Sequence, residues 1–588
     1  MGKMTGYASI DKPQDKGHTF FERNPIIPDM SIYNAIQAIN YFYKDKKAID
    51  CLDLTVDYNK LINDSVTISR ALKELGVKKG QIVSISMPNY YQAVASFMAC
   101  NRIGAIATFL NAKAEEEEIC QYLNLFESPV FINFDKSDEE NMRIKNKTGV
   151  RNIVTLKKND VSNPSLIENY KIISNDDIID FNDLGTIAQF QKKGLPSNSK
   201  KDDALILFTS GSTGNPKSVV LTNENILAAG TYLKNSSRVK NLNGDRTLVC
   251  VPFMYPYGFS TSTLITLLSG KTAILAPDIS NDTIKYYLKK NPNIIFGSPA
   301  LLNLIMKNTD KDADLSSITT YVSGGDFLTP AVYEKGKKFF EEHGAHNVEI
   351  GNGAGNAETV SCGTNPVGIE IRPETTGKVL VGTSAMILND KLEEQKYGKE
   401  GTLYISGKHV FKEYYKNKEE TKKVKILKDG KEYFRTGMLG YIDEDGYFTL
   451  TGRESRFYII STLDKVYCDH VQKLIDNIPG VEESAVVQVP DDDMLFVNKA
   501  YIVLNENAQG NEEAEENVKE RFYRPIELDD GTLKQLKYYE IPDYVEFVKE
   551  LPRKEDSNKI DYDILEKDAK EKLPQGGKVK KLILSKNK

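Results

Sequence analysis

Apolar positions recur with two different periods along the chain, and these periods predict its elements. Over residues 58–76 the apolar side chains keep mixed helical spacings, which predicts a helix. A Gly-bounded turn leads to a short apolar strand over 82–86, a second helix over 89–103, and a further buried strand over 105–110. Strands that alternate with helices in this way are typical of layered α/β structure with parallel strands.

The pattern changes twice further along the chain. Helix and strand alternate again over 245–275 and 280–326, but from 380 to 450 short apolar runs alternate with turns, which predicts a small antiparallel sheet. After about residue 452 a smaller α/β pattern follows. We therefore expect an α/β fold: a large N-terminal domain of layered α/β subdomains plus a small β-rich subdomain, followed by a small C-terminal α/β domain. Organised structure is expected to begin near Ser31, after a polar arm.

Composition narrows the class of protein. The 588 residues carry 77 Lys and Arg against 83 Asp and Glu, a net charge of −6, and this mild acidity argues against a nucleic-acid binder. Hydrophobic residues make up 40% of the chain, enough for sizeable cores. The six Cys and five His are scattered without zinc-type or disulfide-type spacing, which favours buried, reduced thiols.

Targeting signals are missing from the N-terminal residues. They lack the apolar run of a signal peptide, and Gly6 stands where myristoylation requires Ser or Thr. The most apolar stretch, 93–110, is interrupted by Asn101 and Arg102, so it is too polar to span a bilayer. These features predict a cytoplasmic protein without a transmembrane segment.

The segment 205–221 carries the clearest chemistry. An apolar strand enters a loop of small and hydroxyl residues, Thr209 to Gly214, and Lys217 precedes a second apolar run. Glycines allow close backbone approach to a ligand, and free N–H groups and hydroxyls can donate to phosphate oxygens. With the charge of Lys217 this inventory suits a polyphosphate. The loop is not a Walker A motif, because Pro216 rather than Gly precedes the lysine.

This segment resembles the phosphate-binding loop of the ANL superfamily of adenylate-forming enzymes, which includes acyl-CoA synthetases, peptide-synthetase adenylation domains and luciferases. Further segments resemble the other motifs of the family in the expected order, so the resemblance covers roughly residues 30–570. These segments are Val251–Phe259, Ser323–Asp326, Asn352–Glu358, Tyr433–Gly440, Gly452–Arg456 and Leu551–Asp561.

The resemblance implies an acid–thiol ligase of the AMP-forming acyl-CoA synthetase type. Such enzymes join a carboxylic acid to ATP as an acyl-adenylate, then transfer the acyl group to coenzyme A and release AMP. The implied cofactors are ATP, Mg²⁺ and coenzyme A, and the C-terminal domain would be a mobile lid. The expected divisions are an N-terminal arm (1–30), an adenylation domain (31–454), the lid (455–575) and a basic tail (576–588).

The resemblance also assigns residue roles. Lys559 and Thr213 would be catalytic, with Lys559 reaching the α-phosphate and the attacking carboxylate, and Glu358 would ligate Mg²⁺. Arg453 would contact the ribose. The full set expected to bind nucleotide is Thr209, Ser210, Gly211, Ser212, Thr213, Gly214, Lys217, Gly325, Asp326, Asn352, Gly353, Ala354 and Arg453.

The acid is expected to be fatty or aryl. Peptide-synthetase domains place an Asp near 251–266 to pair with an amino group, and this chain has none there. Tyr257 and Phe259 suit an apolar acyl chain, although aromatic residues at these positions equally suit ordinary core packing.

Several positions depart from the family pattern, mainly at the adenosine end. Met438 replaces the Asp that binds the ribose hydroxyls, Ala354 replaces the aromatic that stacks on adenine, and Ala357 replaces a Thr beside the α-phosphate. Alternatives to an active ligase are therefore a non-catalytic nucleotide- or acyl-binding descendant and an adenylating enzyme that loads a separate carrier protein. The sequence carries no signal for an oligomeric state.

Overall fold

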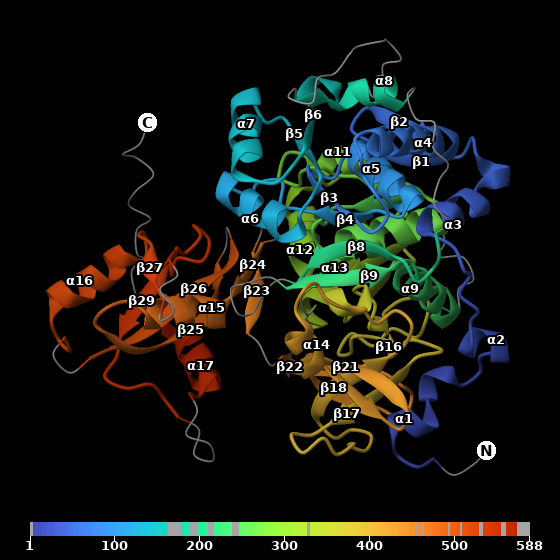
Figure 1. Cartoon of the computed structure of the whole chain (residues 1–588). Coiled ribbons are helices and arrows are strands. Elements are labelled where there is room, and N and C mark those ends of the chain that lie inside the picture. The colour runs from blue at the N-terminus through green and yellow to red at the C-terminus, as the bar shows by residue number, and fades with distance from the viewer. Residues whose placement is uncertain are drawn as a thin grey trace. The chain divides into compact units, whose positions relative to one another are not determined.

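The computed structural model describes residues 4–162, 178–188, 198–209, 217–237, 246–325, 328, 330–453, 456–460, 464–491, 494–505, 508–528, 533–553 and 560–572. The chain divides into two compact units (Figure 1). The first comprises Met1–Thr209 and Lys217–Gly452, and the second comprises Ser210–Pro216 and Arg453–Lys588. Ser455, the first residue of the expected lid, lies outside the described residues.

An eight-stranded sheet forms the first layer of the larger unit, with strand order β19-β9-β8-β4-β3-β5-β6-β7. Its central strands are parallel, while β9 runs antiparallel to both β8 and β19. The strands are β3 (Ile82–Ser86), β4 (Ile106–Phe109), β5 (Val130–Phe134), β6 (Asn152–Leu156), β7 (Ile179–Asp180), β8 (Asp203–Phe208), β9 (Ser218–Thr222) and β19 (Glu413–Tyr414).

Helices cover both faces of this sheet (Figure 1). Their apolar residues form separate buried clusters on the two sides, because successive strand residues such as Ile82 and Val83 point in opposite directions. Gly104 ends the central helix with a φ of 72°, a left-handed conformation that glycine adopts without strain. The helices are α4 (Tyr58–Glu74), α5 (Tyr91–Ile103) and α8 (Leu184–Ala188) on one face, and α6 (Glu116–Phe126) and α7 (Asp138–Lys147) on the other.

A second sheet has seven strands in the order β14-β13-β12-β10-β11-β1-β2, all parallel except β2. The largest core takes side chains from both sheets and from α3 (Ile32–Ile39), α5 and α9 (Asn223–Ser236). The strands are β1 (Lys47–Cys51), β2 (Leu54–Asp57), β10 (Arg246–Val249), β11 (Thr272–Leu275), β12 (Ile294–Gly297), β13 (Thr320–Ser323) and β14 (Glu349–Asn352). On the other face lie α11 (Ile284–Leu288), α12 (Pro299–Asn308) and α13 (Pro330–Glu342).

The predicted β-rich region is a five-stranded antiparallel sheet in which β17, β18, β21 and β20 follow one another and β22 pairs with β21. Its strands are β17 (Ser384–Leu388), β18 (Gly401–Ser406), β20 (Lys425–Lys428), β21 (Lys431–Ile442) and β22 (Phe448–Arg453), and α14 (Lys418–Val424) precedes β20. The prediction of layered α/β subdomains plus a small β-rich sheet is confirmed.

The N-terminal arm corrects one expectation. Regular structure begins before Ser31, since α1 (Ala8–Asp11) and α2 (Phe20–Arg23) precede it. The arm is fixed to the β-rich sheet by hydrogen bonds: Ser9 donates to Glu394 over 2.9 Å, and the Gly382 N–H donates to Asp15 over 3.0 Å. The sequence did not predict these hydrogen bonds, because each connects residues more than 350 positions apart.

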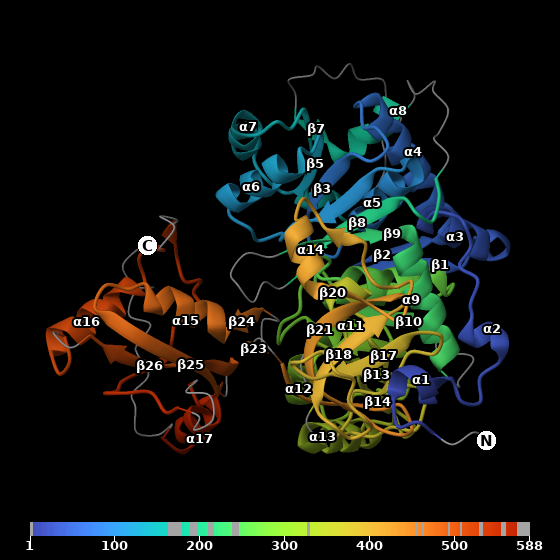
Figure 2. The same cartoon turned by 60° about the horizontal axis from the view of Figure 1, so that its bottom comes forward.

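The second unit is a small α/β structure (Figure 2). It has its own buried apolar core. Its sheet has the order β25-β26-β29, with β25 antiparallel and β29 parallel to β26. The elements are β23 (Phe457–Ile459), β24 (Lys465–Tyr467), α15 (Cys468–Asp476), β25 (Val481–Asp491), β26 (Leu495–Leu504), α16 (Glu512–Arg521), β29 (Tyr544–Phe547) and α17 (Tyr562–Lys572). The predicted basic tail, 576–588, lies outside the described residues.

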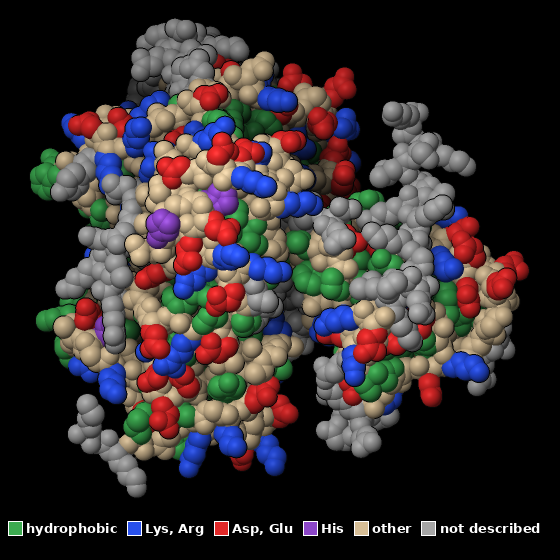
Figure 3. Space-filling model, turned by 180° about the vertical axis from the view of Figure 1, so that it is seen from behind, with side chains coloured by type: hydrophobic (Ala, Val, Ile, Leu, Met, Phe, Trp, Pro, Cys, Tyr) green, Lys and Arg blue, Asp and Glu red, His purple; other side chains and the backbone are tan. Residues whose placement is uncertain are grey.

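The charges on the surface and the burial of the cysteines match what the composition predicts. Acidic and basic side chains are interspersed over the face drawn in Figure 3. All six cysteines are buried and free, as predicted, and burial raises the pKa of the Cys51 and Cys362 thiols to about 12. None of the described helices combines the length and the apolar composition that crossing a membrane requires.

His409 makes the larger unit sensitive to acid. It is fully buried beside Tyr232, and burial lowers its pKa from 6.5 to about 4. Between pH 6.5 and 4 the unfolded chain therefore binds the proton more readily than the folded chain, and stability falls as pH falls. From pH 7 to pH 5 we expect this residue to remove about 2 kcal/mol of unfolding free energy. Urea unfolding at pH 7 and pH 5 should show that the unfolding free energy of His409→Gln depends less on pH than that of the wild type. An unchanged pH dependence would refute the role of His409.

Candidate functional site

The predicted phosphate loop connects two paired strands of the larger unit, β8 and β9. Phe208 at the end of β8 lies opposite Ser218 at the start of β9. The Thr209 N–H donates to the Lys217 carbonyl and the Lys217 N–H donates to Thr209 Oγ1, each over 2.9 Å. These reciprocal bonds fix Lys217 at the base of the loop. The predicted residues between them, Ser210, Gly211, Ser212, Thr213 and Gly214, lie outside the described residues.

One tyrosine joins the predicted phosphate lysine to the predicted metal carboxylate. Lys217 Nζ lies 5.1 Å from the centroid of the Tyr414 ring, and Tyr414 Oη donates to Glu358 Oε1 over 2.5 Å. Tyr414 reaches this position because β19 pairs with β9, with Tyr414 opposite Val219. Lys217 also makes an ion pair with Glu420 at 2.7 Å. The sequence reasoning missed Tyr414 and Glu420, because no local pattern marks a two-residue strand or one glutamate in a charged helix.

The side chain of Glu358 is buried. The residue is 6% exposed, and its backbone carbonyl accepts the Phe411 N–H over 2.7 Å. Burial, then the charge of Glu358, raises the pKa of Tyr414 far above its ordinary value, so the phenol stays a hydrogen-bond donor.

Magnesium fits this donor set only together with a phosphate. Within the described ranges, no group of three Asp, Glu, His or Cys side chains could hold a metal alone. Mg²⁺ is commonly held by one or two carboxylates plus phosphate oxygens and water. Glu358 is a single buried carboxylate, and it contacts Tyr414, the tyrosine whose ring also lies beside Lys217. This arrangement matches that requirement.

The carboxyl ends of β13 and β14 hold further residues that the sequence predicts to bind nucleotide. Ser323 and Asn352 are paired positions of these parallel strands, and the Gly353 N–H donates to the Ser323 carbonyl over 2.8 Å. Ser323 Oγ and Asn352 Nδ2 are buried and have no hydrogen-bond partner among the described residues. Gly325 follows with a φ of 86°, which favours glycine. Ligands of open α/β sheets bind outside these strand ends, so the two polar atoms are candidate contacts. Asp326 lies outside the described residues.

The two altered adenosine positions share one apolar cluster. Ala354 is 4% exposed and Met438 is 1% exposed, and both pack with Phe448 and the β-rich sheet. The Asn356 amide donates to the Thr436 carbonyl over 2.9 Å, which fastens the two segments together. Where the family has an aromatic ring and a carboxylate, this chain therefore has apolar packing.

Restoring the carboxylate is expected to destabilise the protein. An Asp in place of Met438 would bury a carboxylate in the apolar cluster, where apolar side chains surround it. Met438→Asp should therefore lower the unfolding free energy by about 2–3 kcal/mol. Urea unfolding measures this loss, and Met438→Leu, which keeps an apolar side chain, should cost under about 1.5 kcal/mol. Equal stability of the Asp and Leu variants would contradict the packing argument.

The remaining predicted residues are placed as follows. Arg453 ends β22 and is partly buried, at the first residue of the second unit's main segment, and Lys559 lies outside the described residues. Phe259 packs against Phe97 and Phe109 and is fully buried, which supports the core alternative for this aromatic. Tyr257 is also held in place, since its hydroxyl donates to the Val322 carbonyl over 2.7 Å.

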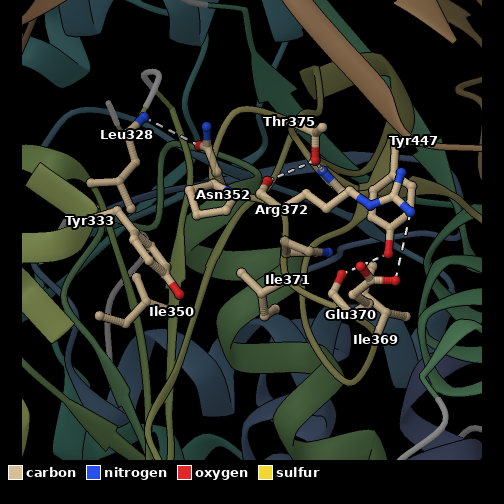
Figure 4. Close-up of a pocket in the computed structure, with 13 residues that line it drawn as sticks. Leu328, Tyr333, Ile350, Asn352, Ile369, Glu370, Ile371, Arg372, Thr375 and Tyr447 are labelled. Atoms are coloured by element: carbon tan, nitrogen blue, oxygen red, sulfur yellow. Dashed lines mark hydrogen bonds and ion pairs between the residues drawn. The ribbon is translucent and has the colours of Figure 1, made fainter. Parts of the chain in front are cut away.

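Two cavities of the larger unit are formed by described residues. One, shown in Figure 4, reaches from Asn352 to Arg372 and Tyr447, and its volume of about 10 Å³ leaves room for no more than one water. A cleft of about 350 Å³ lies between the N-terminal arm and the segment 369–381. Neither contains Lys217 or Glu358 in its lining.

Comparisons with known proteins show the family of this chain. The chain matches the model of the AMP-binding enzyme family over residues 37–415 and that of the AMP-binding enzyme C-terminal domain over residues 470–558. The match to the first model spans well over half of the chain, so the chain belongs to the AMP-binding enzyme family.

The chain is also similar to individual acid ligases in sequence and to solved structures in fold. It is 26% identical over 542 residues to the long-chain-fatty-acid–CoA ligase of Bacillus subtilis (strain 168), covering 90% of this chain and 92% of that protein. The fold matches ATP-bound MatB from Rhodopseudomonas palustris (TM-score 0.62, 23% identity) and the amide bond synthetase McbA from Marinactinospora thermotolerans (TM-score 0.67, 20% identity). Each alignment covers 92% of this chain and 99% of the other. The chain is an ANL-type, acyl-CoA synthetase-like acid–thiol ligase.

Proposed function

We propose that this enzyme activates a fatty or aryl carboxylic acid with Mg²⁺ and ATP and transfers the acyl group to coenzyme A. One observation carries the assignment of the site: Thr209, Lys217, Tyr414 and Glu358 form an unbroken series of contacts. The series brings a hydroxyl, a cation and a buried carboxylate from three separate segments to one place, which is the chemistry that a metal-bound triphosphate requires.

The reaction proceeds in two displacements. A carboxylate oxygen of the acid bonds to the α-phosphorus while the bond from that phosphorus to the bridging oxygen breaks, so pyrophosphate leaves and an acyl-adenylate remains. The thiol of coenzyme A then bonds to the acyl carbon, loses its proton, and AMP departs.

Residues of this chain would neutralise and position the reacting groups. Lys217 would hold the β- and γ-phosphates, and Glu358 would ligate Mg²⁺, which offsets phosphate charge when bound. Thr213 and Lys559 keep their predicted catalytic roles, with Lys559 at the α-phosphate. Arg453 keeps its predicted contact with the ribose, and Asn352 would meet the base. The proposed adenylation domain is 31–454 and the proposed lid is 455–575.

The acid class rests on two supports. No Asp lies between Val251 and Thr266 to pair with an α-amino group. The relative from Bacillus subtilis is named for long-chain fatty acids. A role in fatty acid metabolism and a cytoplasmic location stay predictions from sequence.

A non-catalytic descendant is the second candidate, favoured by the apolar cluster around Ala354 and Met438. Without a ribose-binding carboxylate the scaffold could bind an acyl group or a nucleotide and carry out no turnover.

Acid-dependent formation of AMP from Mg·ATP separates the two. A panel of short, long and aryl acids, assayed with and without coenzyme A, should yield AMP for members of one class. The Lys559→Ala variant should lose about 10²–10³ of the rate. Adenylate formation without any need for coenzyme A, followed as release of pyrophosphate, would indicate either a carrier protein as acceptor or a stalled adenylate. Activation of amino acids alone would overturn the acid class, and no AMP with any acid would favour the non-catalytic candidate.

A further inference from the structure

The cation of the proposed phosphate site already has an internal counterion. Glu420 Oε2 lies 2.7 Å from Lys217 Nζ, and its other oxygen lies 2.5 Å from Lys423 Nζ. Both oxygens of this carboxylate are thus occupied by lysines. The two ion pairs lower the pKa of Glu420 to about 2, so it stays charged at any working pH.

The position of Glu420 is set by the start of a surface helix. Asn417 caps α14 and accepts the Glu420 N–H over 3.2 Å, which places the glutamate in the first turn. None of the residues of this helix is buried. The side chain is therefore attached to a firm backbone position, while solvent around it leaves room for another rotamer.

A polyphosphate and Glu420 need the same partner. Lys217 and Glu420 are each less than a third exposed, so their attraction is only partly screened by water. A phosphate group that approaches Lys217 meets a negative charge within 3 Å of the cation it would bind. Binding must therefore break or weaken the ion pair between Glu420 and Lys217, while Lys423 can keep the released carboxylate.

We propose that Glu420 is an internal competitor that weakens polyphosphate binding to Lys217 and thereby sets the KM for ATP. This inference rests on the proposed function, because it takes Lys217 as the phosphate contact. Glu420 acts through Lys217 and touches no reacting atom, so it is a positioning residue. Its removal changes the affinity for the triphosphate and leaves the rate of the bound complex alone.

The decisive variant is Glu420→Gln, which keeps the shape of the side chain and removes its charge. We expect its Kd for Mg·ATP and for inorganic tripolyphosphate, measured by calorimetry, to fall about 3–10-fold. The gain should shrink as salt is added. AMP, which lacks the β- and γ-phosphates, should bind equally to both proteins. The KM for ATP should fall with kcat unchanged.

A neighbouring glutamate supplies a matched control. Glu419 is 78% exposed and pairs with Lys422 on the same helix, so Glu419→Gln removes the same charge one residue away. Its Kd for tripolyphosphate should stay within about twofold of the wild type. In a Lys217→Met background, Glu420→Gln should no longer tighten binding, because the contested cation is gone.

The outcomes are separable. Weaker or unchanged tripolyphosphate binding in Glu420→Gln, with ATP bound normally by the wild type, would overturn this inference and leave the proposed function standing. An equal gain in Glu419→Gln would also overturn it, since the effect would then be one of general charge. If the wild type bound neither ATP nor tripolyphosphate, the proposed function would fail and this inference with it.

Discussion

Replacing Lys217 with methionine is expected to lower the rate of acid-dependent AMP formation about 10³-fold. Methionine keeps an unbranched side chain that can pack on the Tyr414 ring, but it cannot donate to phosphate. Lys217 is proposed to bind the β- and γ-phosphates, which carry negative charge in bound ATP and again in the leaving pyrophosphate. Its loss should therefore lower both kcat and the affinity for ATP. Steady-state kinetics at saturating acid, together with calorimetric Kd values for ATP, measure the two effects separately.

Lys422→Met is the matched control for this variant. Lys422 lies on α14 at 73% exposure and pairs with Glu419, so its removal deletes an equal charge near the site without touching Tyr414. Its AMP formation should stay within about threefold of the wild type. A Lys217→Met enzyme that matched this control would refute the assignment of Lys217, provided that the thermal unfolding midpoints of the two variants agree.

The elements around the site could be predicted because their signals are local. The apolar runs before Thr209 and after Lys217 are the strands β8 and β9, and the loop chemistry lies in adjacent residues. The helix over 58–76 and the stop at Gly104 likewise depend on spacing and on one glycine. Such patterns can be recognised in a single sequence because they depend only on residues that are close together along the chain.

The contacts that join the site could not be predicted in this way. Lys217 and Glu420 are 203 positions apart, and Tyr414 lies 56 positions from Glu358. Their meeting depends on the pairing of β19 with β9, a two-residue strand without any period of its own. The shared burial of Ala354 and Met438 was equally hidden, since an alanine and a methionine carry no sign of which core they enter.

Glu358→Gln should reduce AMP formation to a similar extent, about 10³-fold, and for a different reason. The amide keeps the shape and can still accept the Tyr414 hydroxyl, but it removes the charge proposed to ligate Mg²⁺. We expect a steep rise in the Mg²⁺ concentration needed for half-maximal activity. Tripolyphosphate binding without Mg²⁺ should be no weaker than in the wild type, because Lys217 is intact and a nearby negative charge is gone.

Tyr414→Phe separates the charge of Glu358 from its placement. Phenylalanine keeps the ring beside Lys217 and deletes only the 2.5 Å hydrogen bond to Glu358. Partners that orient a metal ligand typically contribute 10–100-fold, so a loss of about that size is expected, smaller than in Glu358→Gln. In both variants the loss should be partly recovered at high Mg²⁺. A Glu358→Gln enzyme with the Mg²⁺ dependence of the wild type would show that this carboxylate holds no metal. The pairing of Tyr414 with Glu358 would then serve the packing of β19 alone.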